Sequence, residues 1–481
     1  MTDAIRSGVS LLGPIILITL INLSIQTNKR LTATTDSLMR ILFYSSTFPH
    51  GTARVAGTFN LELCRALAIE HDVRVVAPRS FVDAWRSRGS RTDRVAADGW
   101  VREATGLTAS YPSYFYTPGI ARHRYGDWQW LSVGRHLRAV VDEFQPDAVV
   151  SYWAHPDGEV GLRVAQAANI PSVVIVGGSD VLLLPRDRRR RPKIERVLRE
   201  SSAVMTVSDG LRQSVIDLGA DPSRVATIYQ GVDDELFHPG SQAEARQALS
   251  LPNDRKFLLW VGRMVDVKGL DTLIEAFDLA QQKIPKLQLL LVGDGPERSA
   301  VQRDIDRRGL NDFVRFIGPK SHSELPNWYR AADLVVLSSW SEGLPNVLRE
   351  AVSCGRPFVS TNVGSVCEIA DSHGGPAFAE LVPIRDAVTL ASAIGRTLRP
   401  EYLAAAQLFP CRSWRDTADD LVSLLRRLRG ESATSTTRQR VVSERMIQAE
   451  ATHTETTRLR VVLTGMPLTE NLSATIPTGS R

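Results

Sequence analysis

Two carboxylates, Glu342 and Glu350, stand seven residues apart around a turn that precedes a predicted helix. The turn, residues 341–346 (SEGLPN), follows the apolar run 334–337. Its glycine and proline interrupt a strand, and the apolar positions beyond it have helical spacing. A helix start offers unpaired N–H groups to a diphosphate, and carboxylates accept hydrogen bonds from sugar hydroxyls. Ordinary acids of a helix start explain the spacing equally well, so both interpretations stay open.

Two basic residues form the second candidate group. Arg263 and Lys268 lie in the loop 262–269, between the apolar run 257–261 and a predicted helix. In a parallel sheet such a loop stands at the carboxyl ends of the strands, where ligands bind. A guanidinium and an ammonium aimed at one diphosphate would stabilise a departing nucleotide as a divalent metal does. Taken alone, scattered solvated charge is the more common explanation of basic loop residues.

A third turn, residues 291–296 (LVGDGP), also joins a strand to a helix. Gly293 would allow a close backbone approach to a ligand, whereas Asp294 is better explained as a turn residue. The sequence contains no GxGxxG fingerprint and no P-loop. The acidic pair Asp304 and Asp306 falls within a helical pattern, which indicates a solvated helix face rather than a metal site.

The candidate site segments lie within a chain that divides into two α/β halves. Short apolar runs alternate with helical patterns in both, which predicts two doubly wound parallel sheets. The strands are predicted at 40–45, 73–77, 148–152, 172–176, 203–207 and 225–229, then at 257–261, 287–292, 314–317, 334–337 and 357–360. The helices are predicted at 60–69, 158–168, 210–218, 269–282, 296–308, 324–331, 386–398 and 414–428.

Composition leaves room for several domains and few special sites. The 481 residues are 43% hydrophobic and 23% charged, with a net charge of +5. This mild excess does not argue for nucleic acid, and fits anionic small molecules or a membrane surface. The four cysteines are far apart in the sequence, so neither a disulfide framework nor a zinc site is indicated. A reducing compartment is the simpler expectation.

The first 38 residues allow three interpretations. Residues 7–28 carry no charge and are mostly apolar, at the short limit of a membrane span. Lys29 and Arg30 would then keep the rest of the chain cytoplasmic. A signal peptide fits less well, since no clear cleavage site follows. Met39 is also a natural start of an α/β domain, which would make residues 1–38 an over-long gene prediction.

The order of the motifs resembles the retaining glycosyltransferases of family four. The motifs are GR-x4-KG at 262–269, VGDGP at 292–296, FIG at 316–318, SxxEGLPNVLREAVSCGRPFV at 339–359 and VGS-x2-EI at 363–369. The match spans roughly residues 39–428. It implies the GT-B architecture, α/β with two facing Rossmann-like doubly wound domains and a cleft between them.

The resemblance also implies roles for single residues. Arg263 and Lys268 would bind the donor diphosphate and stabilise the leaving group, Glu342 would contact the transferred sugar, and Glu350 would hold the ribose. His155 matches the family's active-site histidine, although a histidine in an ordinary turn competes with that assignment. The remaining donor-binding candidates are backbone positions or neighbours of the base: Gly57, Gly293, Ile317, Gly318, Gly343, Leu344, Pro345, Asn346 and Val347.

The implied domain plan has six parts. Residues 1–38 are the apolar segment, 39–235 the acceptor-side domain, 236–254 a linker, 255–412 the nucleotide-sugar-binding domain, 413–430 a helix packing back on the first domain, and 431–481 a disordered tail. Two departures concern the sugar and the acceptor: the turn 342–346 replaces the common EGFG type, and the turn at Gly177 and Gly178 lacks a frequently seen histidine.

The expected function is a retaining, metal-independent hexosyltransferase that needs no cofactor. It would move a hexose from a nucleoside diphosphate sugar to a saccharide or lipid-linked acceptor in glycan or polysaccharide biosynthesis, by front-face attack. The expected location is the cytoplasm, and association with the inner face of the membrane is a further option. No nucleic-acid partner is expected. A nucleotide-sugar 2-epimerase and a non-catalytic GT-B partner subunit are the alternatives. The basic run 186–191 would meet anionic lipid or a phosphorylated acceptor, or is a solvated loop.

Overall fold

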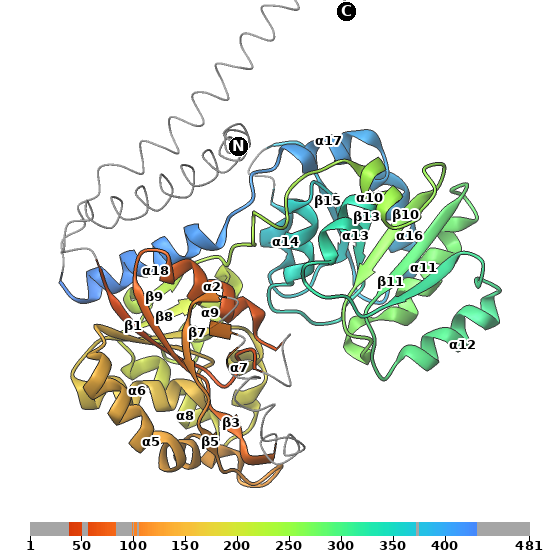
Figure 1. Cartoon of the computed structure of the whole chain (residues 1–481). Coiled ribbons are helices and arrows are strands. Elements are labelled where there is room, and N and C mark those ends of the chain that lie inside the picture. The colour runs from red at the N-terminus through yellow and green to blue at the C-terminus, as the bar shows by residue number, and fades with distance from the viewer. Residues whose placement is uncertain are drawn as a thin grey trace, which may run out of the picture. The chain divides into compact units, whose positions relative to one another are not determined.

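Two parallel β-sheets organise the chain (Figure 1). The structure is a computed structural model that describes residues 38–50, 56–82, 99, 101–102, 105–371 and 375–430. The first sheet has the strand order β4-β2-β1-β6-β7-β8-β9, and the second has the order β12-β11-β10-β13-β14-β15. Every strand pair in both sheets is parallel, as the alternation of strands and helices predicts.

The first sheet is built from short strands, of which the central ones are buried. Its strands are β1 Arg40–Tyr44, β2 Asp72–Val76, β4 Thr108–Ser110, β6 Ala148–Tyr152, β7 Ser172–Val176, β8 Ala203–Thr206 and β9 Val225–Thr227. The helices associated with it are α2 Thr58–Ala68, α5 Tyr125–Phe144, α6 Asp157–Ala168, α7 Ser179–Leu182, α8 Arg191–Glu200 and α9 Asp209–Asp217. A separate two-stranded sheet pairs β3 Arg79–Ser80 with β5 Ser113–Tyr114.

The second sheet repeats this plan. Its strands are β10 Lys256–Val261, β11 Leu287–Val292, β12 Val314–Gly318, β13 Leu334–Leu337, β14 Phe358–Thr361 and β15 Ala379–Val382. Its helices are α10 Gln242–Ala248, α11 Leu270–Gln281, α12 Arg298–Arg308, α13 Leu325–Ala331, α14 Asn346–Ser353, α15 Val366–Ala370, α16 Ala387–Thr397 and α17 Pro400–Leu408. The predicted strands and helices of both halves are confirmed to within a few residues at each end.

Both faces of each sheet are covered, which explains the unbroken apolar runs. Along β1, Ile41 and Phe43 enter one core cluster while Leu42 and Tyr44 enter another. Successive side chains of a strand point to opposite faces, so a strand between two helix layers needs apolar residues at every position. The residues of β10 divide in the same way between the two clusters of the second sheet.

The last described helix, α18 Trp414–Leu428, returns to the first sheet. Its buried face, including Trp414, Leu421 and Leu425, belongs to the same core cluster as β1 and β2, and the helix packs against α2 (Figure 1). Ser413 starts the helix with a capping box, in which its hydroxyl and the Asp416 carboxylate each bond the other residue's backbone N–H.

The segment 236–254, predicted as a linker between the two halves, is partly helical. It contains α10, whose Arg246 is buried and donates to Asp333 Oδ2 at 2.7 Å and to the Ala331 carbonyl at 2.9 Å. Part of this polar segment is therefore a helix held by hydrogen bonds to the last residue of α13 and to Asp333, just before β13. The helices α5, α8 and α17 and the strand β15 were also not predicted.

The expectations for the two ends of the chain lie outside the described residues. They concern the apolar segment 1–38, of which only Leu38 is described, and the tail 431–481. In the part of the chain that the structure describes, no helix combines the length and the apolar content that crossing a bilayer needs.

Candidate functional site

The turns that follow β10, β11 and β12 are joined into one edge by backbone hydrogen bonds. The Gly262 N–H donates to the Val292 carbonyl at 3.0 Å, and the Gly293 N–H donates to the Gly318 carbonyl at 2.9 Å. The Met264 N–H also donates to the Asp294 carbonyl at 2.9 Å. The loop that carries Arg263 and Lys268 is therefore held by the end of β11 and the turn after it, which is bonded in turn to the end of β12. Ile317, next to Gly318, is partly buried against the core behind this edge.

Gly293 is required by this edge itself. Its φ is +128°, and a Cβ atom built there would lie 1.8 Å from the Gly262 carbonyl oxygen. The sequence suggested a close approach between this glycine and a ligand, but the close approach that the structure shows is between two turns of the protein. A role in donor binding stays a prediction.

Lys268 and Glu342, predicted to share a site, are in direct contact. Lys268 Nζ donates to Glu342 Oε1 at 2.5 Å, and the Ser339 hydroxyl donates to the same oxygen at 2.6 Å. Both charged side chains are partly buried, with 22% of Lys268 and 12% of Glu342 exposed. A cation and a carboxylate thus meet at the carboxyl end of the second sheet, where parallel sheets bind ligands.

Backbone packing fixes the two loops that carry this pair. The Ser338 hydroxyl donates to the Lys268 carbonyl at 2.9 Å, and the Trp340 N–H donates to the Val267 carbonyl at 2.8 Å. Arg263 lies in the same loop with its side chain exposed. Among the described residues, it makes no ion pair with Glu342 or with any other acid. Lys268 and Glu342 are therefore in contact, whereas Arg263 lies in the same loop with its side chain in solvent.

The turn after Glu342 is fitted closely between other backbone segments. The Ser365 N–H donates to the Gly343 carbonyl at 3.0 Å, and a Cβ on Gly364 would lie 2.1 Å from the Glu342 carbonyl oxygen. From the first sheet, the turn at Gly177 and Gly178 approaches Gly343, since a Cβ on Gly343 would lie 3.0 Å from the Gly177 carbonyl oxygen. Leu344 is partly buried against the core of the first sheet.

Helix α14 begins at this turn without a side-chain cap. Pro345 occupies the N-cap position, and its side chain has no acceptor for the N–H groups of the first turn, which starts at Asn346 and Val347. The Asn346 amide oxygen accepts from Arg349, whose guanidinium also donates to the Gly231 carbonyl at 3.1 Å. The start of the helix thus offers backbone donors and a positive dipole end.

Glu350 contacts residues other than Lys268 and Glu342. It is buried on α14, its Oε2 accepts from the Tyr329 hydroxyl at 2.7 Å, and its Oε1 lies 3.5 Å from His322 Nε2. Burial alone would lower the pKa of His322, but the hydrogen bond and charge of Glu350 outweigh it and raise that pKa. Sequence reasoning missed Tyr329 and His322, since nothing in their local sequence marks them as partners of Glu350.

Gly57 also has a structural explanation. It precedes α2 with φ +70°, and a Cβ there would lie 2.3 Å from the Thr47 carbonyl oxygen. Thr47 further accepts from the Asn60 amide at 2.6 Å. The glycine is therefore needed for the packing of the loop after β1, whether or not a ligand approaches it.

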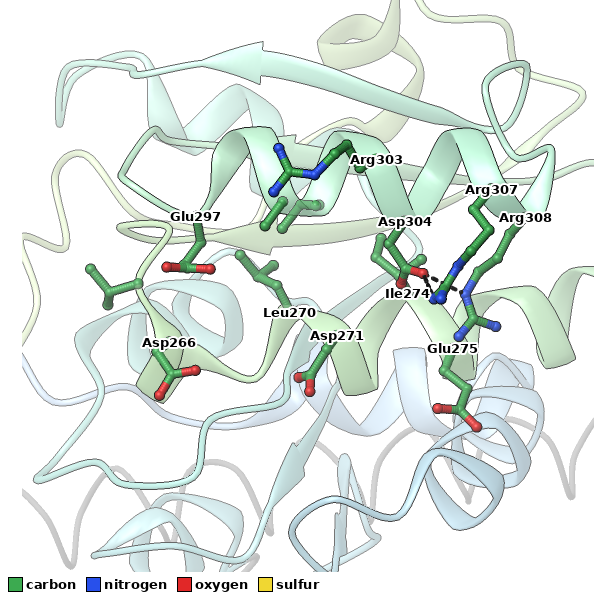
Figure 2. Close-up of a pocket in the computed structure, with 13 residues that line it drawn as sticks. Asp266, Leu270, Asp271, Ile274, Glu275, Glu297, Arg303, Asp304, Arg307 and Arg308 are labelled. Atoms are coloured by element: carbon green, nitrogen blue, oxygen red, sulfur yellow. Dashed lines mark hydrogen bonds and ion pairs between the residues drawn. The ribbon is translucent and has the colours of Figure 1, made fainter.

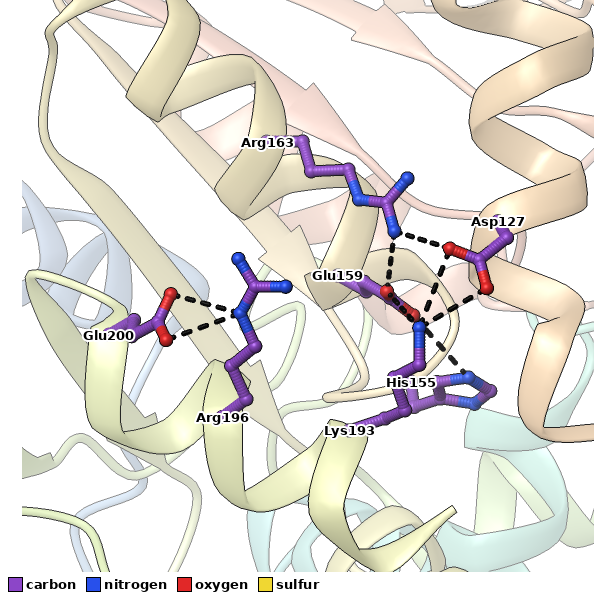
Figure 3. Close-up of polar contacts among 7 residues, drawn as sticks. All are labelled: Asp127, His155, Glu159, Arg163, Lys193, Arg196 and Glu200. Atoms are coloured by element: carbon purple, nitrogen blue, oxygen red, sulfur yellow. Dashed lines mark hydrogen bonds and ion pairs between the residues drawn. The ribbon is translucent and has the colours of Figure 1, made fainter. Parts of the chain in front are cut away.

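His155 lies in a buried polar cluster (Figure 3). Its side chain is 0% exposed, and its Nε2 is 3.7 Å from Glu159 Oε2. Glu159 Oε1 accepts from Arg163 at 2.7 Å and from Lys193 at 2.8 Å, and both cations also contact Asp127. Among the described residues, no hydrogen bond or ion pair joins His155 to Lys268 or Glu342. The structure therefore shows no direct contact between this predicted catalytic residue and the Lys268–Glu342 pair.

Burial controls the charge of His155. It lowers the pKa of the imidazole to about 4, against the opposing effect of Glu159. Nearby, burial raises the pKa of Asp157 to about 6, although Asp157 accepts hydrogen bonds from Ser46 and Gln129. At pH 7 the histidine is thus neutral within the protein interior. Its catalytic role stays a prediction.

We expect the unfolding free energy of His155→Asn to depend less on pH, under acidic conditions, than that of wild type. Between pH 6.5 and 4 the unfolded chain binds a proton at this histidine that the folded chain does not, so stability falls as the pH falls through that window. Without the histidine, the slope of unfolding free energy against pH should decrease by about 1.4 kcal/mol per pH unit there. Urea unfolding at pH 4.5, 5.5 and 6.5 measures the slope. His238→Asn, at an exposed histidine, is the control, and equal slopes in wild type and His155→Asn would refute the assignment.

A pocket of about 590 Å³ lies elsewhere, between α11 and α12 (Figure 2). Its lining mixes acids and bases, and none of the predicted site residues lines it. Asp304 pairs there with Arg307 and Arg308, at 3.2 Å from Arg308 Nε. Asp304 and Asp306 both lie on α12, as the helix-face interpretation predicts.

Comparisons with known proteins agree with this architecture. The family described as glycosyl transferases group 1 matches residues 241–405, and the family described as Glycosyltransferase Family 4 matches residues 56–236. The D-inositol 3-phosphate glycosyltransferase of Mycobacterium tuberculosis (strain H37Rv) is 33% identical over 249 residues, which are 49% of this chain. The match covers 51% of that relative, so the chain spans about half the length of the curated relatives it matches.

Solved structures share the fold over most of the chain. Anabaena Alr3699/HepE in complex with UDP has a TM-score of 0.60 at 19% identity and covers 83% of this chain and 100% of its own. Sucrose-phosphate synthase from Thermosynechococcus elongatus has a TM-score of 0.63 at 22% identity, covering 82% and 100%. These likenesses show the fold, two Rossmann-like parallel-sheet units in the GT-B arrangement. The chain belongs to the group 1 glycosyltransferases of family 4.

Proposed function

We propose that this chain is a retaining hexosyltransferase that uses a nucleoside diphosphate sugar. The observation that carries the proposal is the Lys268–Glu342 pair at the strand ends of the second sheet, next to the uncapped start of α14. The acceptor would be a saccharide or a lipid-linked saccharide, in glycan or polysaccharide biosynthesis. HepE, which shares the fold, is described in complex with UDP-glucose, and this supports a sugar nucleotide as the donor class.

The donor diphosphate would take the place at which Lys268 now meets Glu342. The ammonium, the Arg263 guanidinium and the first N–H groups of α14 all favour negative charge. With Lys268 directed to the phosphate, Glu342 would accept a hydrogen bond from a hydroxyl of the sugar. Glu350 would bond a ribose hydroxyl through an oxygen that now faces Tyr329 or His322.

The reaction would then proceed on one face of the sugar. The bond between the anomeric carbon and the phosphate oxygen breaks, and its electron pair leaves with the nucleoside diphosphate. The acceptor oxygen bonds the anomeric carbon from the same face, and its proton passes to the departing phosphate oxygen. Lys268 and Arg263 would stabilise the growing negative charge, which is the task of a divalent metal in other transferases. No metal or cofactor is needed in this scheme.

The two sheet regions would bind different substrates. The region 255–412 would bind the donor, and the region 39–235 would bind the acceptor through its strand-end loops, including the turn at Gly177 and Gly178. The Asp180 carboxylate orders that turn, since it accepts from the Gly178 N–H at 2.9 Å and the Ala154 N–H at 3.0 Å. We place the enzyme in the cytoplasm.

A donor-hydrolysis assay tests this function. UDP-, GDP- and ADP-sugars are incubated with the protein without acceptor and with EDTA, and the released nucleoside diphosphate is measured. The proposal expects release from one of the three donors. Release from none would favour the non-catalytic partner subunit, and an epimeric sugar nucleotide detected by NMR would favour the 2-epimerase; either result would overturn it.

A further inference from the structure

Two segments at the strand-end side of the first sheet combine exposed aliphatic side chains with arginines. In residues 182–191 (LLLPRDRRRR), Leu182 and Leu183 are 39% and 49% exposed. In residues 120–124 (IARHR), Ile120 is 70% exposed. The arginines of the two segments that are exposed are Arg122, Arg124, Arg186, Arg188, Arg189 and Arg191. We call these six arginines with the three aliphatic side chains the arginine surface.

Contacts behind the arginine surface hold the two segments together. The Arg190 guanidinium lies 5.4 Å from the centre of the Tyr125 ring, directly after the 120–124 segment. Lys193 Nζ of α8 lies 3.2 Å from Asp127 Oδ2 of α5, and Figure 3 shows both side chains turned to one another. Arg190 is buried, so the run 186–191 is not simply the solvated loop that its composition suggests. One of its arginines fixes the segment, and its neighbours stay on the surface.

The charge of this surface is poorly balanced. Asp187 is the one acid within the two segments, and Glu195 pairs with Arg191 at 2.7 Å. The other exposed arginines of the surface make no ion pair with an acid among the described residues. A net positive surface with exposed leucine and isoleucine side chains offers two kinds of contact to the same partner.

We propose that the arginine surface docks the protein on an anionic membrane. Arginines attract acidic headgroups, and the leucine and isoleucine side chains enter the boundary between headgroups and acyl chains. A soluble polyanion would use the charges but leave the aliphatic side chains in water, so the membrane fits the whole surface. Docking here would set the strand-end loops of the first sheet near lipid-linked molecules. The inference does not depend on the proposed transferase activity.

Vesicle flotation of the full chain tests the proposal. The vesicles contain phosphatidylcholine either alone or with one third phosphatidylglycerol. We expect flotation with the anionic vesicles and little with the neutral ones, and release at 1 M salt, where charges are screened within about 3 Å. The triple variant Arg186→Gln/Arg188→Gln/Arg189→Gln should bind about a hundredfold more weakly, since each arginine near such a surface contributes about a factor of five. Leu183→Ser should weaken binding further.

A matched triple variant controls for net charge. Arg255→Gln/Arg303→Gln/Arg315→Gln changes three exposed arginines of the second-sheet region and should bind like wild type. The Tm of each variant shows whether it is folded. Equal flotation of both triple variants, or of wild type on neutral and anionic vesicles, would overturn the proposal. So would pyrophosphate binding in calorimetry that Arg186→Gln/Arg188→Gln/Arg189→Gln removes, without any flotation of wild type, which would indicate a soluble phosphorylated ligand.

Discussion

Lys268→Ala is expected to lower donor turnover by about a hundredfold to a thousandfold. The ammonium is the cation that the structure places directly against Glu342 at the strand ends of the second sheet. Removal of one preorganised donor to developing negative charge costs about 2.7–4 kcal/mol of transition-state stabilisation. The stability cost should be small, since the pair is partly exposed and Glu342 keeps its hydrogen bond from Ser339.

The measurement is nucleoside diphosphate release from the preferred donor at saturating concentration. Lys286→Ala is the matched control, because Lys286 is an exposed lysine of the same region that pairs with Asp254. The control should hydrolyse the donor like wild type, and both variants should keep a Tm near that of wild type. Turnover of Lys268→Ala within a factor of two of wild type would remove Lys268 from the donor site.

Gly293→Ala is expected to disrupt the same site through the backbone. The added methyl group would lie 1.8 Å from the Gly262 carbonyl oxygen, so the turn that leads into Arg263 must move. Overpacking of this kind costs about 1–3 kcal/mol, and a left-handed φ for a residue with a Cβ adds about 1–2 kcal/mol. We expect a clear fall in Tm and loss of measurable donor binding.

Gly309→Ala separates backbone strain from displacement of the turn. Gly309 also has a left-handed φ, +69°, but nothing lies within 4 Å of its added Cβ. This variant should be destabilised only by the cost of the left-handed φ, and it should bind the donor like wild type. Equal effects of the two substitutions on donor binding, measured by calorimetry at a temperature where both are folded, would contradict the role given to the Gly262–Gly293 contact.

The arrangement of strands could be predicted because burial dictates composition. Residues 257–261 and 334–337 are apolar at every position, and only a strand covered on both faces needs that pattern. Helix α18 was also predicted with its observed bounds, since its apolar residues recur at helical spacing. Helix α10 was not, because a short polar helix fixed by Arg246 to Asp333 has the composition of a connection.

The Lys268–Glu342 contact shows what pattern and resemblance achieve together. The two residues are 74 positions apart, and only their shared place at strand ends relates them. His155 shows where such reasoning stops. It lies 3.7 Å from Glu159, which is part of a cluster of charges from α5, α6 and α8. A sequence pattern does not encode which charges three helices will bring near one imidazole. The same holds for Glu350 with Tyr329, whose contact depends on how α13 meets α14.

The configuration of the released sugar tests the central proposal most directly. An NMR time course follows the anomeric proton while the wild-type protein, with EDTA, acts on the preferred donor, and the same course is recorded with Lys268→Ala. We predict that the sugar first appears with the anomeric configuration of the donor and that the variant releases almost none in the same time. Initial release of the opposite anomer, or equal release by the variant, would contradict a retaining transfer supported by Lys268.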